Sequence, residues 1–306
     1  MIAVAATIAA SVAVGIATER RLGATAQRAA RAALAAMLWV LVPFVVFFNV
    51  AHLHVDTDVG GGLALAYVAL ALAGALAWLV GTRVLALDRP RTGTVMCGAI
   101  HANTGYLGLP LAAALLGSSR LGEAAAYDAL VGGPAFFVGV FALAAAFGAR
   151  GGSGLRERIE AFALRNPPLL AVVAGLAAPA SLAPDGLVDA SHVVVYALAP
   201  LGFFAVGVTL AAEAEEGVLP VPPPLDRAIL ATVLLRLLVA PALLLALAAP
   251  LIDLPSGYLL LAAMPMGINS LVAAHAYGLD LRIASAAIAW STAVVLAGGL
   301  AVAAAG

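Results

Sequence analysis

Long apolar segments follow one another along the whole chain, separated only by short polar loops. A membrane-spanning helix needs about 20 mostly apolar residues, and ten segments come close to that length. Only 10% of the 306 residues are charged, whereas a soluble domain carries about 25%. The sequence therefore predicts one integrated, all-α membrane domain. The ten predicted spans are 2–18, 33–51, 61–82, 92–117, 124–148, 166–183, 191–212, 227–250, 256–278 and 283–304.

Basic residues divide the loops into two sets and predict how the chain is oriented. Thirteen arginines lie on one side of the predicted spans, whereas only Arg120 lies on the other. Because loops rich in basic residues stay in the cytoplasm, both termini are predicted to be extracytoplasmic, in a plasma (inner) membrane. The first apolar segment has no basic residue before it, so it is interpreted as a span and not as a signal peptide. The thirteen are Arg20, Arg21, Arg28, Arg31, Arg83, Arg89, Arg91, Arg150, Arg156, Arg158, Arg165, Arg227 and Arg282.

The loop 149–165, predicted to be a cytoplasmic linker, separates two halves with five spans each, 1–148 and 166–306. Since five is odd, any repeat between the halves must be inverted across the membrane. LVPFVVFF at 41–48 is similar to LAPLGFF at 198–204, although Ala- and Leu-rich spans also resemble one another by chance. The pattern favours a five-plus-five inverted repeat, in which discontinuous helices mark the binding site.

The sequence HANTGYLGLP at 101–110 interrupts the fourth span with residues that helices disfavour. Pro110 removes a backbone donor and disfavours helix at the preceding residue, while Asn103 can bond the groups that unwinding frees. Asn103 lies about 11 residues, or roughly 16 Å at helical rise, into its span, which is close to the midplane. MPMGINS at 264–270 interrupts the ninth span in the same way.

Two interruptions in opposite orientations predict that the fourth and ninth helices cross. Non-helical backbone at membrane depth survives only when it is buried in protein or lines a cavity. The half-helix N-termini at such a crossing favour an anion. A simple Pro kink is the alternative, but paired Asn and Gly residues favour a binding site. The predicted substrate-binding residues are Asn103, Thr104, Gly105, Tyr106, Pro110, Pro265, Gly267, Asn269, Ser270 and Arg236.

Four further polar residues have two interpretations each. Arg236, about 13 Å deep by helical rise, either attracts a substrate carboxylate or braces backbone carbonyls, since an intramembrane Arg is rarely idle. Asp128 is either a proton carrier or a solvated interfacial residue. His101 and His275 are candidates for proton coupling because His titrates near neutral pH, although such a residue is more often simply hydrogen-bonded.

The motifs resemble those of the auxin efflux carrier family of membrane transporters, which includes bacterial permeases and the plant auxin carriers. NTGYLGLP at 103–110 resembles the family's N-T-x-x-x-G-x-P crossover, and MPMGINSLVAAHAYGLD at 264–280 resembles its ninth-span crossover. RLLVAP at 236–241 and ASAAIAWST at 284–292 are similar to the eighth and tenth spans. Plant carriers have Pro where this chain has Asn269-Ser270, so the resemblance does not imply aromatic-acid specificity.

The resemblance implies a scaffold domain, a transport domain with the crossed helices, elevator-like alternating access and a homodimer. It implies a small organic anion as substrate, either auxin-like or a mono- or dicarboxylate. Residue by residue, Asn103 and Pro110 match the fourth-span crossover, and Pro265 and Gly267 match the ninth.

A different class of transporter is the main alternative: a sodium- or proton-coupled symporter or antiporter of the bile-acid-symporter-like fold. Such antiporters generally need paired buried carboxylates, and no predicted span carries a central pair. The chain has no HExxH, GxSxG or GxxxxGK[ST] motif, so neither a hydrolytic enzyme nor a built-in ATPase is expected. No cofactor is predicted beyond coupling to H⁺ or Na⁺. The expected partners are the anion, the lipid bilayer and a second copy, with no nucleic acid.

Overall fold

The computed structural model describes residues 2–51, 57–149, 167–215 and 223–305. Within these ranges the chain forms helices and one isolated β-bridge, and it forms no strand. The predicted all-α class is therefore confirmed for the described residues. Of the linker predicted over 149–165, only Ala149 is described, and the rest lies outside these ranges.

The first helix group combines the N-terminal helices with two helices from the second half of the chain. It contains α1 (Ile2–Leu22), α2 (Ala24–Ala36), the π-helical turn η1 (Met37–Leu41), α3 (Val42–Val50), α10 (Pro167–Ala177) and α11 (Asp185–Glu215). α1 and α2 meet at Gly23, whose φ of 47° favours glycine. α1 lies against α11 so closely that a Cβ atom on Gly15 would overlap the carbonyl of Phe204, and one on Gly207 the carbonyl of Val12. Small residues allow membrane helices to approach in this way.

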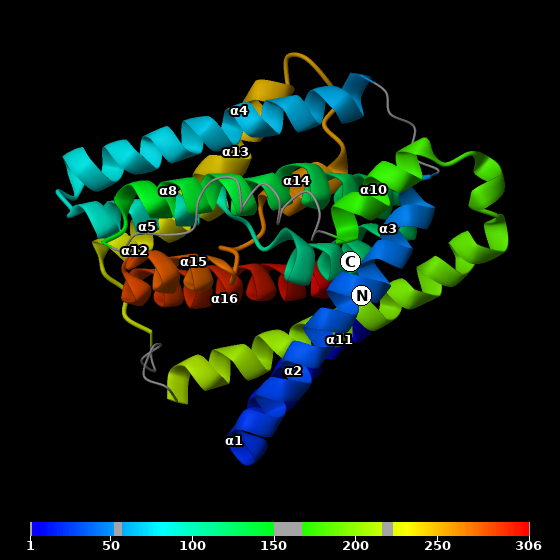
Figure 1. Cartoon of the computed structure of the whole chain (residues 1–306), viewed down its shortest axis with the longest axis horizontal. Helices are drawn as coiled ribbons and strands as arrows, with labels where there is room; N and C mark the ends of the chain where they lie inside the picture. The colour runs from blue at the N-terminus through cyan, green and yellow to red at the C-terminus, as the bar shows by residue number, and fades with distance from the viewer. Residues whose placement is uncertain (1, 52–56, 150–166, 216–222, 306) are drawn as a thin grey trace.

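The second helix group contains the remaining long helices and both interrupted ones (Figure 1). In the first half of the chain it includes α4 (Thr57–Leu79), η2 (Val80–Val84), α5 (Arg89–Ile100), η3 (Thr104–Gly108), α6 (Leu109–Leu116), α7 (Leu121–Tyr127), η5 (Asp128–Gly132), η6 (Ala135–Val140) and α8 (Phe141–Phe147). In the second half it includes α12 (Arg227–Leu234), η8 (Leu235–Val239), α13 (Ala240–Ala248), α14 (Ser256–Ala262), α15 (Ser270–Tyr277) and α16 (Leu281–Ala305). Short 3₁₀ turns lie at η4 (Ser118–Arg120) and η7 (Ala180–Leu182).

Wide π-helical turns recur in this group, and such turns are frequent at functional sites. Several of these turns lie next to a proline. A proline supplies no N–H for the i→i−4 hydrogen bond, so the regular helical pattern is broken there. Pro134, between η5 and η6, cannot donate to the carbonyl of Leu130, and the hydroxyl of Tyr67 on α4 donates to that carbonyl instead. Since lipid offers no hydrogen bonds to a freed carbonyl, Tyr67 compensates for the proline.

Five helices of the described residues are long and apolar enough to cross a membrane by length and composition. They are Ala24–Val50, Thr57–Val84, Leu121–Phe147, Arg227–Ala248 and Leu281–Gly299. Large apolar side chains such as Trp39, Leu72 and Leu79 are exposed on them, as is expected where lipid is the solvent. The layout of ten spans in an inverted repeat stays a prediction.

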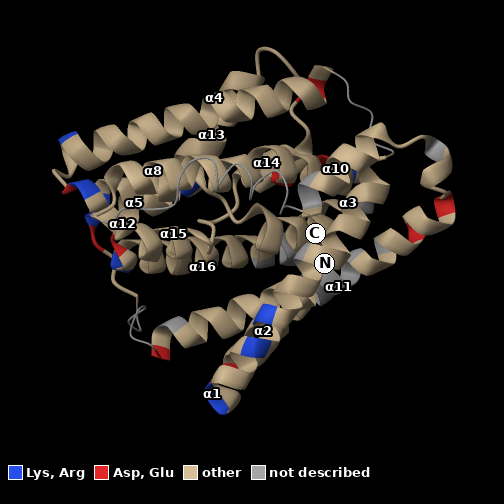
Figure 2. Cartoon of the chain, in the orientation of Figure 1, with Lys and Arg blue, Asp and Glu red and all other residues tan. Residues whose placement is uncertain are grey.

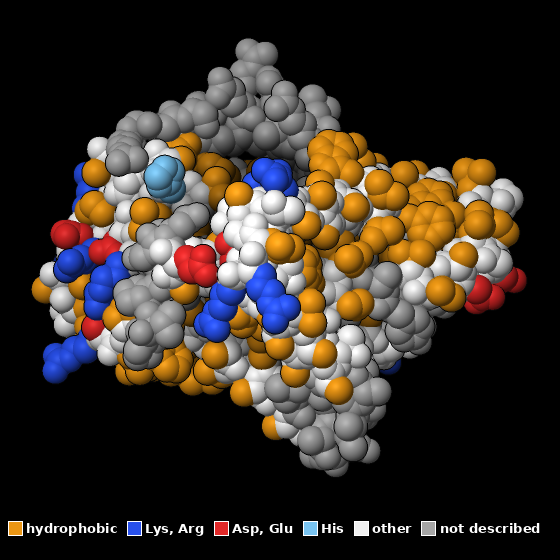
Figure 3. Space-filling view, turned by 90° about the horizontal axis from the view of Figure 1, so that it is seen from below, with side chains coloured by type: hydrophobic (Ala, Val, Ile, Leu, Met, Phe, Trp, Pro, Cys, Tyr) orange, Lys and Arg blue, Asp and Glu red, His pale blue; other side chains and the backbone are white. Residues whose placement is uncertain are grey.

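Many charged side chains lie near the ends of the helices, with long apolar stretches between them (Figure 2). Hydrophobic side chains cover much of the face seen from below (Figure 3). At one end of the second group, Arg91 pairs with Asp280 at 3.1 Å and Arg282 pairs with Asp226 at 2.7 Å. Both arginines belong to the predicted cytoplasmic set, and their ion pairs join α5, α12 and α16 at that end.

Two helices continue beyond the apolar segments from which they were predicted. The helix containing the predicted span 33–51 begins at Ala24, and α11 extends from Asp185 to Glu215, beyond the predicted 191–212. Hydropathy marks the apolar part of a helix, whereas polar residues such as Gln, Arg and Glu are themselves good helix formers. The helices therefore continue into their polar ends.

Candidate functional site

The fourth and ninth predicted spans are both interrupted, and their interruptions cross. α5 ends at Ile100 and α14 at Ala262, and the two following segments form an antiparallel bridge between Ala102 and Met266. The amide of Asn103 donates to the carbonyl of Pro265 at 2.8 Å, and the amide of Gly267 to that of His101 at 3.0 Å. Backbone groups freed by one interruption thus bond those freed by the other. This satisfies both segments inside the protein, as non-helical backbone at membrane depth requires.

The first interruption is shorter than the sequence suggested. Non-helical backbone covers only 101–103, and the helix resumes as the π-helical turn η3 before reaching Pro110. The turn is wide because the carbonyl of Asn103 accepts from the amide of Gly108 at 2.9 Å, five residues on. Gly105 and Tyr106, which lie within the stretch 101–110 that the sequence marked as an interruption, are therefore helical.

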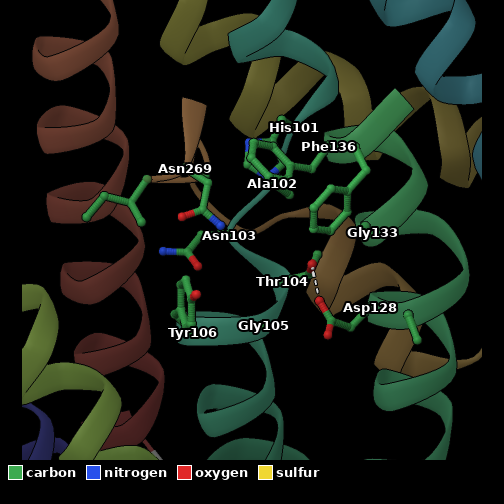
Figure 4. Close-up of a pocket in the computed structure, with 15 residues that line it drawn as sticks. His101, Ala102, Asn103, Thr104, Gly105, Tyr106, Asp128, Gly133, Phe136 and Asn269 are labelled. Atoms are coloured by element: carbon green, nitrogen blue, oxygen red, sulfur yellow. Dashed lines mark hydrogen bonds between the residues drawn. The ribbon is translucent and has the colours of Figure 1, made fainter. Parts of the chain in front are cut away.

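A cavity of about 180 Å³ lies beside the crossing. On one side the carboxamides of Asn103 and Asn269 approach each other, and the hydroxyl of Tyr106 points toward them (Figure 4). The three polar groups come from both interrupted helices, so the crossing itself assembles this wall. The cavity is lined by His101, Ala102, Asn103, Thr104, Gly105, Tyr106, Asp128, Ala129, Gly132, Gly133, Phe136, Phe137, Gly267, Ile268 and Asn269.

The opposite wall carries a carboxyl group. Asp128, the first residue of η5, accepts a hydrogen bond from the hydroxyl of Thr104 at 2.5 Å (Figure 4). Two glycines make room for this pair. A Cβ atom on Gly132 would overlap the Thr104 hydroxyl, and one on Gly105 would lie 3.4 Å from Asp128 Oδ1. The interfacial, solvated interpretation of Asp128 is not what the structure describes, because this carboxyl lines the interior cavity.

His101 closes one end of the cavity. It is buried, its Nδ1 lies 2.7 Å from the hydroxyl of Ser270, and its ring stacks on Phe136 with the centroids 4.9 Å apart. It also faces Gly267, where a Cβ atom would overlap the imidazole. His101 therefore joins α5, α15 and η6 around the crossing, which agrees with the hydrogen-bonded interpretation made from its sequence position.

Arg236 lies behind the crossing. Its side chain is buried, with Nη1 donating to the carbonyl of Ala99 at 2.9 Å and Nη2 donating to the carbonyl of Ala262. These carbonyls belong to the last turns of α5 and α14, where the negative end of the helix dipole stabilises a cation. Nη1 and Nη2 thus act as the brace that one of the two interpretations described, and the guanidinium is not part of the cavity lining.

Eight of the predicted residues line the cavity and five do not. Those that do are Asn103, Thr104, Gly105, Tyr106, Gly267, Asn269, Asp128 and His101. Pro110, Pro265, Ser270 and Arg236 lie outside the lining, next to it in the chain or behind the crossing, and His275 is exposed on α15. Sequence reasoning missed the wall formed by η5 and η6. Its signal was the i, i+4, i+8 spacing of Asp128, Gly132 and Phe136, which places them on one helix face.

The hydrogen-bond donors that remain available to a ligand lie mainly on the Asn103 and Asn269 side of the cavity. The side-chain amides of Asn103 and Asn269 can donate, and the first-turn amides of η3 have no partners within their own helix. At α15, however, the amides of Ser270 and Leu271 donate to the carbonyls of Gly267 and Ile268, so this helix start offers fewer free donors than predicted. No Lys or Arg lines the cavity, and the described residues contain no group of three His, Cys, Asp or Glu suited to a metal ion.

These features define a helical membrane protein whose interior cavity is built by two crossed, interrupted helices. Residues 161–298, slightly less than half of the chain, match the model of the family described as "Membrane transport protein". This family includes the auxin efflux carriers, so over these residues the match confirms the resemblance. The match contains the ninth-span crossover but not the fourth. A comparison with curated proteins found no match.

Proposed function

We propose that this membrane transporter is a secondary carrier that moves a small organic anion, a mono- or dicarboxylate or an auxin-like acid, across the plasma membrane. The observation that carries the proposal is the wall where Asn103, Asn269 and Tyr106 converge at the crossing. Side-chain amides, a hydroxyl and the first-turn amides of a helix are the groups that bind carboxylate oxygens. The cavity of about 180 Å³ suits a ligand of few heavy atoms.

An elevator-like movement of the second helix group along the first fits the way the two groups meet. The cavity belongs to the second group, but Tyr106 lies against the first, where a Cβ atom on Gly202 of α11 would come within 2.7 Å of its carbonyl. Because glycine has no side chain, this contact has none that would obstruct a movement of one group along the other. The same proposal includes an inverted repeat of 1–148 and 166–306, extracytoplasmic termini and a homodimer.

The alternative is a sodium- or proton-coupled symporter or antiporter of the bile-acid-symporter-like fold. Asp128 favours it, because a carboxyl in the cavity can carry a proton or a cation. The two proposals differ in what must bind at the Asn103 and Asn269 wall. A cation-coupled antiporter needs carboxylates, of which the cavity lining supplies Asp128 alone, whereas an anion carrier needs the amides.

Uptake into proteoliposomes tests the choice. The full-length protein is reconstituted and offered radiolabelled malonate, malate and indole-3-acetate, with empty vesicles as the blank. Asn103→Ala and Asn269→Ala should each reduce anion uptake about 10- to 100-fold, since losing one hydrogen bond to a charged group costs about 1.5–3 kcal/mol. Asn49→Ala is the matched control, because Asn49 bonds Ser191 and the carbonyl of Val45 in the first helix group, away from the cavity. If the wild type moves none of the three anions, or both alanine variants transport as well as it does, the anion-carrier proposal fails.

A further inference from the structure

The cavity combines an anion-binding wall with an acidic residue and no basic one. Asp128 lines the same cavity as Asn103 and Asn269, whereas Lys and Arg are missing from its lining. The buried Arg236, a candidate for a neutralising charge, directs its Nη atoms at the carbonyls of Ala99 and Ala262 behind the crossing. An ionised Asp128 would therefore face a carboxylate substrate without a cation between them. Two carboxylates that share one site hold a proton between them.

We infer that Asp128 is a proton-binding residue and that the carrier binds its anion together with one proton, held between Asp128 and the substrate. The inference rests on the proposed anion transport and adds its coupling ion. Asp128 Oδ1 accepts from Thr104, and the described residues supply no hydrogen-bond donor to Oδ2. A proton on Oδ2 makes Asp128 a donor to an oxygen of the bound anion and removes the repulsion between them. The anion and the proton then leave together when the cavity opens on the other side.

The surroundings of Asp128 support a proton more than a metal cation. Gly105 and Gly132 keep the space beside the carboxyl open, and Thr104 contributes one hydroxyl as a donor. A sodium or divalent ion needs several oxygen ligands, but the neighbouring turns η3 and η5 are helical, so most of their carbonyls accept helical hydrogen bonds. Among the described residues only Thr104 is hydrogen-bonded to the Asp128 side chain, and this pair alone is too small a ligand set for a metal ion.

Other ionisable groups around Asp128 do not replace it in this role. From η3 comes Tyr106, and from α4 the hydroxyl of Tyr67, which donates to the carbonyl of Leu130. In α7, Glu123 pairs with Arg120 at 2.7 Å. His101 lines the cavity but directs Nδ1 to Ser270. The packed residues of α10, Pro167–Ala177, and of η6, Ala135–Val140, contain no ionisable side chain.

Proton flux that accompanies anion flux is the decisive measurement. The full-length protein is reconstituted with pyranine inside the vesicles, and the membrane potential is clamped at zero with potassium and valinomycin. Radiolabelled malonate, malate or indole-3-acetate is then added outside, with a lumen about two pH units more alkaline. One proton per anion supports accumulation of up to about a hundredfold, since each pH unit is a factor of ten. The lumen of wild-type vesicles should also acidify as the anion enters.

Asp128→Asn keeps the shape of the side chain and removes the site for the proton. In this variant, exchange of internal for external anion should continue at an altered rate, while accumulation driven by the pH gradient and luminal acidification are lost. Asp253→Asn is the matched control, because Asp253 is exposed in the loop between α13 and α14, and it should behave as the wild type. If Asp128→Asn does not purify as a monodisperse protein, the wild-type acidification alone decides.

Several results overturn the inference. Anion transport by the wild type that is independent of the pH gradient, or accumulation driven by a sodium gradient instead, excludes proton coupling. So does an Asp128→Asn variant that still accumulates the anion under a pH gradient. If the wild type moves none of the three anions at all, the proposed function itself fails, and the inference fails with it.

Discussion

The imidazole ring of His101 fills the space that a side chain on Gly267 would need, since a Cβ atom there would overlap the ring. The same residues are joined through the backbone, where the Gly267 amide donates to the His101 carbonyl at 3.0 Å. One residue belongs to each interrupted helix. A change at this contact therefore alters the crossing and the cavity wall together.

Gly267→Ala should lower both stability and transport. The added methyl must displace the His101 ring, which is held by Ser270 and Phe136, and overpacking of this kind costs about 1–3 kcal/mol. The thermal midpoint of the purified protein and malonate exchange in vesicles measure the two effects. Gly298→Ala is the control, because nothing lies within 4 Å of its Cβ position. Equal behaviour of the two variants would show that the crossing tolerates a side chain at this position.

Arg236→Met should destabilise the protein more than it weakens anion binding. Methionine approximates the length of the stem but leaves the carbonyls of Ala99 and Ala262 without their donors, and hydrogen bonds to a charged group contribute about 1.5–3 kcal/mol each. Thermal unfolding and a malonate concentration series on the folded fraction separate the two quantities. Arg83→Met, at an exposed position on η2, controls for the loss of a charge. An unchanged midpoint with weakened anion affinity would instead support direct attraction of the substrate.

Tyr67→Phe should cost about 0.5–1.5 kcal/mol, the usual net value of one hydrogen bond. The lost hydroxyl donates to the carbonyl of Leu130, for which Pro134 has no N–H to offer. A double-mutant cycle with Pro134→Ala tests this reason, since alanine restores an amide donor. The cost of Tyr67→Phe should shrink in that background. If the two substitutions are additive, the hydroxyl does not compensate for the proline.

Asp226→Asn should destabilise the protein at neutral pH and have little effect in acid. Partial burial pushes the pKa of Asp226 upward, but the amides of Ile229 and Ala228 and the Arg282 guanidinium more than offset it, so the pKa lies below its usual value. A carboxyl with a depressed folded-state pKa contributes stability above its unfolded value of about 3.9, and the contribution is lost as pH falls through the folded value. Thermal midpoints of wild type and variant, measured from neutral to acidic pH, should therefore converge. Asp253→Asn, in an exposed loop, controls for the loss of one acidic side chain.

Local sequence signals located the crossing but not its surroundings. Asn, Gly and Pro in the middle of apolar segments predicted both interruptions, because each residue type acts on the backbone at its own position. The π-helical turn after Asn103 was not predictable, since its wide hydrogen bond to Gly108 depends on where the partner segment fixes the backbone. The contact of Asp128 with Thr104 likewise requires knowing which helices are neighbours. Hydropathy alone left this residue undecided between the interface and the interior.

The sequence alone also did not indicate which glycines lie at contacts between helices. Gly15 and Gly207 read as ordinary residues of apolar segments, and only the packing of α1 against α11 gives them a role. Arg236 shows the opposite case. Its depth and its cost in a membrane were evident from the sequence, but its two interpretations differed only in which partners the fold supplies.

The contact between Gly15 and Gly207 also sets an order of assembly. The ribosome makes Gly207 nearly two hundred residues after Gly15, a delay of roughly 10–40 s at about 5–20 residues per second. During that interval α1 has been made, while the helix that packs against Gly15 does not yet exist. The first helix to be made is thus among the last to reach its final neighbours. The N-terminal helix and α11 therefore cannot reach their final packing as parts of separate modules.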